Sequence, residues 1–163
     1  MYIRKAKNDD LPEIMDIYRA AQDFMIESGN PNQWGRTYPN RNLIEEDIAG
    51  GICLLVCDEG IAHGVFALSR GEEPTYQHIE NGKWLNDDEY VTVHRIASDG
   101  KVHGIFKCAI QYLKKNNTNI RIDTHKSNII MQKLIERNGF QKCGTVYVRD
   151  GSPRLAYQWS KVF

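Results

Sequence analysis

The sequence has 163 residues, of which 41% are hydrophobic and 26% charged, and this composition is typical of a globular protein with a single domain, residues 1–163. Its 21 Lys and Arg side chains balance its 21 Asp and Glu side chains. We therefore expect no nucleic-acid partner, because such a protein needs a basic face. The first residues contain no signal-like apolar segment and no later apolar run reaches membrane-spanning length, so we expect a cytoplasmic protein without a membrane partner.

The four cysteines indicate neither a metal site nor a disulfide framework. Cys53, Cys57, Cys108 and Cys143 form no CxxC pair and have no His partner at zinc-finger spacing. Cys53 and Cys57 lie on the same face of a predicted strand and are not placed to bridge each other. We expect reduced thiols and no bound metal.

The N-terminal segment predicts a strand followed by an amphipathic helix. Tyr2–Ala6 alternates in the manner of a strand. Asp10 and Glu13 have the spacing of a capping box, and apolar residues then recur at helical intervals as far as Gly29, which can end a helix.

A loop, a short helix and a hairpin follow. Residues 30–42 are rich in turn formers and predict a loop, and Leu43–Ala49 predicts a short helix. Ile52–Cys57 and Ile61–Leu68 are rich in strand formers, and the sequence Asp-Glu-Gly at 58–60 between them is typical of a hairpin turn.

The rest of the chain alternates strands and helices after an irregular polar stretch at 69–88. We predict these elements in chain order: a strand Tyr90–Ala97, a helix from about 104 to 116, a strand Asn119–Thr124, a helix from about 128 to 138, and strands Lys142–Val148 and Arg154–Ser160. The resulting order βααβββαβαββ favours an α/β fold with one mixed sheet and helices on both faces.

The loop Asp99–Gly104 joins a predicted strand to a predicted helix. Gly100 allows a tight turn, and Gly104 lets the backbone approach a ligand closely. The free N–H groups of the first helical turn favour a pyrophosphate, to which Lys101 and His103 would add positive charge. A plain connection that uses its glycines only as turn formers is the alternative. The loop has neither GxxxxGK[ST] nor GxGxxG spacing.

Taken together, these segments resemble the GNAT N-acetyltransferase superfamily. The resemblance is carried by Arg95-Ile96-Ala97, by the Gly-Lys-Val-His-Gly loop at 100–104, by Asn128, and by Leu134-Ile135-Glu136-Arg137-Asn138-Gly139-Phe140. The region Trp34–Tyr38 also resembles a subgroup of small bacterial members of this family.

This resemblance implies an acyl-CoA N-acyltransferase fold, with a central, mostly antiparallel sheet and a splay between the strands at about 90–97 and 119–124. Acetyl-CoA would then be the acetyl donor. The pantetheine would lie beside the first strand, the pyrophosphate at the loop, and a helix would line the other wall. The cofactor-binding residues implied in this way are Ile96, Ala97, Ser98, Gly100, Lys101, Val102, His103, Gly104, Ile105, Phe106, Asn128 and Met131.

Several positions depart from the family pattern. Asp99 stands where the family has Arg or Gln, and Val102 stands where it has Gly, so we expect weaker binding of CoA. Many relatives have a tyrosine that protonates the leaving thiolate, and this position is Ile135 here. Tyr147, Cys143 or water could take over that role.

The transfer also needs a base, because the attacking amine must be neutral. His94 has a suitable intrinsic pKa, although a histidine that is simply hydrogen-bonded in a strand is the alternative. His125 is a second candidate. The acidic run 87–89 could relay protons or could be a solvated surface segment.

The predicted function is an N-acetyltransferase that moves an acetyl group directly from acetyl-CoA to a primary amine in a ternary complex. Trp34 and Tyr38 could form a wall for a small-molecule or peptide amine, or could cover the core. A homodimer is possible on the resemblance. The alternatives are a non-catalytic acyl-CoA-binding sensor or interaction module, a nucleotide-binding regulator, and covalent acetyl transfer through Cys143.

Overall fold

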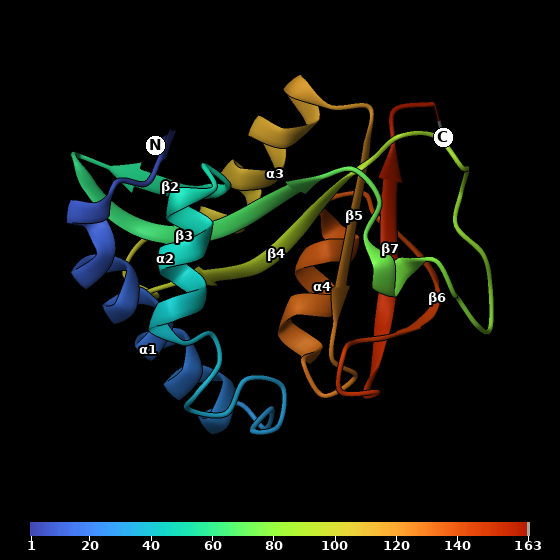
Figure 1. The fold of residues 1–163 in the computed structure, drawn as a ribbon, viewed down its shortest axis with the longest axis horizontal. Helices are drawn as coiled ribbons and strands as arrows, with labels where there is room; N and C mark the ends of the chain where they lie inside the picture. The colour runs from blue at the N-terminus through green and yellow to red at the C-terminus, as the bar shows by residue number, and fades with distance from the viewer. Residues whose placement is uncertain (163) are drawn as a thin grey trace. The chain divides into compact units, whose positions relative to one another are not determined.

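The order of strands and helices in the computed structural model is the predicted one (Figure 1). The structure describes residues 1–162. The elements in chain order are β1 (Tyr2–Lys5), η1 (Asn8–Asp10), α1 (Leu11–Glu27), α2 (Arg41–Ala49), β2 (Cys53–Asp58), β3 (Ile61–Arg70), η2 (Pro74–Tyr76), β4 (Val91–Ser98), α3 (Ile105–Asn116), β5 (Asn119–Thr124), α4 (Ile129–Arg137), β6 (Gln141–Tyr147) and β7 (Pro153–Ser160). The two short 3₁₀ helices, η1 and η2, were not predicted.

The strands form a seven-stranded sheet in the order β1-β2-β3-β4-β5-β7-β6. Strand β4 pairs with β5 in parallel, whereas β1–β2, β2–β3, β5–β7 and β6–β7 are antiparallel. Within residues 1–162 the parallel ladder consists of Val91 with Ile120 and Thr92 with Arg121, although β5 continues to Thr124. The mixed, mostly antiparallel sheet is confirmed, and the short ladder agrees with the expected splay.

The chain divides into two compact units. The first unit contains residues 1–68 and 94–112, and the second contains residues 69–93 and the chain from Leu113 onward. Strand β4 and helix α3 each have residues in both units. That residues 1–163 form one domain stays a prediction.

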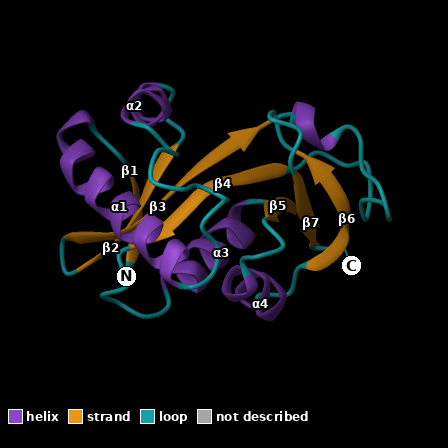
Figure 2. Cartoon of the chain, turned by 90° about the horizontal axis from the view of Figure 1, so that it is seen from below, coloured by secondary structure: helices purple, strands orange, loops and turns teal. Residues whose placement is uncertain are grey.

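The core of the first unit lies between α1, α2 and the strands β2 and β3 (Figure 2). The helices bury apolar residues at helical spacing, and β2 buries alternate residues toward them. These core residues include Ile14, Ile17, Tyr18, Ala21, Ile44, Ile48, Cys53, Leu55, Cys57 and Val65. All four cysteines of the chain are free.

Helix α3 packs against the opposite face of the sheet in this unit. Gly64 pairs with Val56, whose neighbours Leu55 and Cys57 face α1 and α2. A Cβ atom at Gly64 would lie 2.3 Å from Cγ2 of Ile105, the first residue of α3. Gly64 therefore makes room for α3, and helices cover both faces of the sheet within this unit.

The second unit is built on the β5–β7–β6 ladder and an aromatic cluster. Tyr76, Val146 and Ala156 are buried there, and Trp84 and Tyr90 pack against them. None of the helices within residues 1–162 is long and apolar enough to span a membrane.

One predicted helix start is wrong in its detail. Asp10 precedes α1, but its side chain does not cap that helix. Its carboxylate instead accepts two hydrogen bonds of 2.8 Å from Arg4 and one of 2.7 Å from the Lys7 N–H. The Asp10 carboxylate, which the sequence pattern assigned to the cap of α1, is thus used by the ion pair with Arg4 and by the 3₁₀ helix η1.

Candidate functional site

The loop between β4 and α3 turns on two glycines. Gly100 and Gly104 have φ angles of 76° and 84°, a region that favours glycine over other residues. The Gly100 N–H donates to the Ser98 hydroxyl oxygen at 3.0 Å, and the Lys101 N–H donates to the Asp99 carboxylate at 2.9 Å. Two of the seven main-chain amides expected to face a pyrophosphate are therefore already engaged by side chains of the loop.

The first turn of α3 has N–H groups that are available to bind an anion. The Cys108 N–H donates to the Gly104 carbonyl at 2.9 Å, as in a regular helix. The N–H groups of the preceding residues 105–107 have no carbonyl partner within the helix. Lys101 and His103 are exposed beside this turn. An anion at the start of α3 would therefore meet main-chain donors together with positive charge.

The carboxylate of Asp99 is bound by a histidine of β3. The register shift between Val56 and Cys57 leaves His63 without a partner on β2. The His63 carbonyl accepts from the Asp99 N–H at 3.0 Å, and His63 Nδ1 lies 2.8 Å from an Asp99 carboxylate oxygen. With one carboxylate oxygen on His63 and the other on Lys101, both acceptor atoms of Asp99 are engaged, which explains how the loop tolerates an acidic residue.

Strand β4 is distorted at Arg95. The φ angle of Arg95 is 53°, which is uncommon for a residue with a side chain. The Tyr18 hydroxyl donates to the Arg95 carbonyl at 2.9 Å and supports this conformation from α1. Ile96 and Ala97, which follow, are buried, and Ser98 is half-buried.

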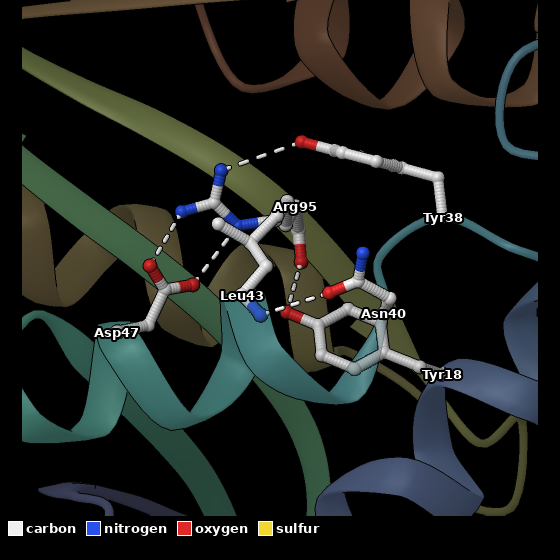
Figure 3. Close-up of polar contacts among 6 residues, drawn as sticks. All are labelled: Tyr18, Tyr38, Asn40, Leu43, Asp47 and Arg95. Carbon is white, nitrogen blue, oxygen red and sulfur yellow. Dashed lines mark hydrogen bonds and ion pairs between the residues drawn. The ribbon is translucent and has the colours of Figure 1, made fainter.

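The Arg95 side chain forms a buried ion pair with α2 (Figure 3). Nε and Nη2 donate to the two carboxylate oxygens of Asp47 at 2.9 and 2.8 Å, and Nη1 donates to the Tyr38 hydroxyl at 3.4 Å. Burial alone would lower the pKa of Arg95, but Tyr38 and Asp47 outweigh it and raise that pKa. Burial raises the pKa of Asp47, against the opposite effects of Arg95 and His94.

The two aromatic candidates of the first unit have different surroundings. Trp34 is 9% exposed and belongs to the core cluster, where it packs edge-on to Tyr18 at 5.8 Å between ring centroids. Tyr38 is 40% exposed, packs on Trp34 at 6.2 Å, and is fixed by a hydrogen bond from Gln22 to its carbonyl. Of the two side chains, Tyr38 is therefore the one exposed at the surface, whereas Trp34 covers the core.

His94 is half-buried in β4, next to the distortion at Arg95. Its charge would lower the pKa of Asp47, which places it within electrostatic range of the ion pair. A proton acceptor at this position would therefore lie close to the polar cluster of the first unit.

Two of the cofactor-binding candidates, Asn128 and Met131, belong to the second unit, whereas the others lie in the first. Asn128 precedes α4, and its side-chain oxygen accepts a 3.1 Å hydrogen bond from the Met131 N–H. Asn128 therefore caps this helix, and Met131 is half-buried in its first turn. Their role in binding a cofactor stays a prediction.

The second unit contains the candidate acid Tyr147, the candidate base His125 and the candidate nucleophile Cys143, and the pKa of each is shifted. Tyr147 is 38% exposed and donates to Glu80 at 2.8 Å, a contact that raises the pKa of the tyrosine. Burial raises the pKa of Cys143 and lowers that of His125, whose Nδ1 accepts from the Ser127 N–H. The Cys143 thiol is therefore protonated at neutral pH, which disfavours the covalent route.

A polar hollow of about 680 Å³ lies within the second unit. It is lined by residues 70–72, 87–91, 114–119 and 161, and so includes the acidic run 87–89. The three acidic side chains of this run are exposed at its wall. Among residues 1–162, no group of three or more His, Cys, Asp or Glu side chains could hold a metal ion.

Sequence reasoning missed Asp47 and Tyr18, and used Arg95 only as part of a family pattern. Asp47 did carry a signal, because it shares the apolar face of its helix with Ile44 and Ile48 at helical spacing. A charge in that position needs a partner, and the partner is on β4.

Comparison with solved structures identifies the family. A crystal structure of a GNAT-family acetyltransferase from Streptococcus agalactiae has 34% sequence identity and a TM-score of 0.89, over 98% of this chain and 95% of that one. No protein-family model matches the chain, and no curated protein matches it significantly by sequence.

More distant structures share the fold. An N-acetyltransferase from Staphylococcus aureus is 22% identical, with a TM-score of 0.59 over 98% of both chains. A phosphinothricin acetyltransferase from Sinorhizobium meliloti, solved in complex with acetyl-CoA, is 16% identical, with a TM-score of 0.65 over 98% of this chain and 87% of that one. With its 34% identity to the streptococcal protein over nearly the whole length of both chains, this chain belongs to the GNAT family of acetyltransferases.

Proposed function

We propose that the protein transfers an acetyl group from acetyl-CoA to a primary amine, directly and in a ternary complex. The observation that carries this proposal is the connection from β4 to α3. It brings the main-chain donors of a helix N-terminus together with two exposed basic side chains, Lys101 and His103. Membership of the acetyltransferase family supports it.

The residues of this loop fit a diphosphate. The first turn of α3 offers N–H groups that have no partner within the helix, and the helix dipole favours a negative charge there. The one acidic side chain of the loop, Asp99, is bound to His63 and to the Lys101 N–H. Ile96 and Ala97 would lie beside the thioester, and Asn128 and Met131 are proposed as further cofactor-binding residues.

In the transfer, the amine nitrogen forms a C–N bond with the thioester carbonyl carbon, and the C–S bond breaks as the thiolate leaves. The protein has to accept the proton that the amine loses, and we propose His94 for this role. Tyr147 is proposed to return a proton to the thiolate. The Tyr147 hydroxyl is protonated at neutral pH, but its contact with Glu80 raises its pKa and makes it a weaker acid, so Glu80 would have to release the hydrogen bond before the transfer.

One observation favours a second candidate function, a non-catalytic acyl-CoA-binding sensor. Ile135, at the position where many relatives have a proton-donating tyrosine, is fully buried in α4. A protein that only binds acyl-CoA needs no proton donor there.

Thiol release separates the two candidates. The protein is mixed with acetyl-CoA and a panel of primary amines, and free CoA is measured with a thiol reagent. We expect release that depends on both the enzyme and the amine. Binding of acetyl-CoA with no amine-dependent release across the panel would instead favour the sensor. A thermal-shift series with acetyl-CoA, ATP and NAD tests the nucleotide-binding alternative, because a ligand stabilises the native state that binds it.

A further inference from the structure

The polar cluster around Arg95 has features that acetyl transfer itself does not require. A buried carboxylate, Asp47, holds a guanidinium group at the one residue of β4 with a positive φ angle. Two tyrosines from other elements contact the same residue, Tyr18 at its carbonyl and Tyr38 at its side chain (Figure 3). A residue in this conformation has to be stabilised by its surroundings, and such residues are frequent at ligand sites.

The guanidinium group has hydrogen-bonding capacity left. Its bonds to Asp47 and Tyr38 use three of its five N–H groups, and one group each on Nη1 and Nη2 has no partner within residues 1–162. The Tyr38 hydroxyl accepts from Nη1, so its own hydrogen is available to a further acceptor. Arg95 and Tyr38 together therefore present N–H and O–H donors at an exposed tyrosine.

The cluster offers little to a bare ammonium group. Asp47 is 5% exposed, and both of its carboxylate oxygens accept from Arg95. No negative charge of the pair is therefore left over for a cation, whereas the donors of Arg95 and Tyr38 match an oxygen atom. Arginine is particularly suited to carboxylate and carbonyl oxygens because its N–H groups lie in one plane.

We infer that the acceptor amine carries a carboxylate or carbonyl oxygen, as in an amino acid or an amino-acid amide, and that Arg95 and Tyr38 bind this oxygen. The inference rests on the proposed function, which places Ile96, the next residue of β4, beside the thioester. An oxygen bound at Arg95 would then hold the amine of the same molecule near the reacting carbonyl. Arg95 and Tyr38 are substrate-specificity residues in this account.

Matched amines test the inference. Leucine, leucinamide and 3-methylbutylamine share one carbon skeleton and one amine, and phenylalanine, phenylalaninamide and 2-phenylethylamine form a second such series. Acetyl transfer to each is followed by CoA release. We expect kcat/KM for the better oxygen-bearing member of a series to exceed that for the oxygen-free amine at least about tenfold, the effect of one good hydrogen bond. The acid and the amide then distinguish a carboxylate from a carbonyl requirement.

Two variants connect this preference to the named residues. Tyr38→Phe removes only the hydroxyl of an exposed side chain, and we expect it to raise KM for the oxygen-bearing amines with a smaller effect on kcat. Arg95→Lys keeps a positive charge beside Asp47 but loses the planar group, and we expect it to reduce the preference further. Tyr2→Phe removes the hydroxyl of another exposed tyrosine, on β1, and should leave the preference unchanged.

The outcomes separate the inference from the function on which it rests. If oxygen-free amines react as well as their counterparts, or if Tyr38→Phe weakens all three amines of a series equally, the inference is overturned while acetyl transfer stands. If no amine of any kind supports CoA release, the proposed function is overturned together with the inference.

Discussion

Arg95 of the first unit and Arg121 of the second both have side chains with little exposure, and the two are accommodated in opposite ways. Arg95 of the first unit is paired with a carboxylate, Asp47, and its pKa is raised. Arg121 of the second unit is 4% exposed and lies between the rings of Trp84 and Tyr90, at 4.0 and 3.9 Å from their centroids. Burial lowers the pKa of Arg121, which donates one hydrogen bond to the Asn86 carbonyl.

The difference separates a structural arginine from a candidate binding residue. Arg121 is enclosed by aromatic rings in a regular strand paired on both sides, and Nε is buried without a hydrogen-bond partner among residues 1–162. Arg95 lies in a distorted strand and contacts an exposed tyrosine.

The largest effect on stability is expected from breaking the ion pair between Arg95 and Asp47. Arg95→Met leaves the Asp47 carboxylate buried without its partner, which typically costs about 3–5 kcal/mol. Urea denaturation of the variant at pH 7 measures the loss. The control is the double variant Arg95→Met/Asp47→Leu, in which both charges are removed and most of the stability should return. A double variant no more stable than the single one would contradict the assignment of the cost to the unpaired carboxylate.

A change of packing without a change of charge should have the next largest effect. Gly64→Ala would place a Cβ atom 2.3 Å from Ile105, so the first residue of α3 must move. Such overpacking costs about 1–3 kcal/mol. Because α3 begins there, we also expect weaker acetyl-CoA binding, measured by calorimetry. The double variant Gly64→Ala/Ile105→Ala relieves the contact and should bind better than Gly64→Ala alone. Unchanged binding in Gly64→Ala would show that the start of α3 does not form the donor site.

The half-buried ion pair between Arg4 and Asp10 provides a smaller, pH-dependent effect. Hydrogen bonding to Arg4 lowers the pKa of Asp10 below its ordinary value of 3.8, so the folded protein favours the ionised form. The stabilisation is therefore present above pH 3.8 and is lost as the pH falls through the lowered pKa. Asp10→Asn should cost about 1 kcal/mol at pH 7, since the pair is partly screened by solvent. A stability gap to the wild type that does not shrink toward pH 2 would refute this account.

The smallest effect is expected for Arg121 of the second unit. Arg121→Met removes a buried charge that has no carboxylate partner in the described chain, residues 1–162, and the flexible thioether can still fill the space between Trp84 and Tyr90. We expect a change in unfolding free energy of less than about 1 kcal/mol, in contrast to Arg95→Met. A loss as large as that of Arg95→Met would abolish the distinction between the two arginines.

The sequence predicts elements well where a periodic pattern continues over several turns or strand residues. Strand β5 was predicted with its observed bounds, Asn119–Thr124, and α3 was predicted to within one residue at its start. The helix cap at Asp10 was wrong, because a carboxylate in the right position for a cap formed a stronger bond with Arg4 from β1. Local spacing does not indicate such a competitor from another strand.

In the candidate site, too, contacts between residues far apart in the sequence were not predicted. The sequence identified the loop Asp99–Gly104, but not that His63 would bind Asp99, because a register shift in β3 is what frees that histidine. Nor did it identify the pairing of Arg95 with Asp47, which are 48 residues apart and meet only through the packing of α2 on the sheet. Contacts of this kind depend on the fold and not on any local pattern.

The account depends most on the start of α3 binding the diphosphate of the acetyl donor. Calorimetric titration of the wild-type protein with acetyl-CoA and with S-acetylpantetheine, which lacks the diphosphate and the nucleotide, tests this directly. We predict that acetyl-CoA binds at least about a hundredfold more tightly, the effect of two charge-assisted hydrogen bonds, and that Lys101→Glu reduces this advantage. Equal affinity for the two donors would contradict the account.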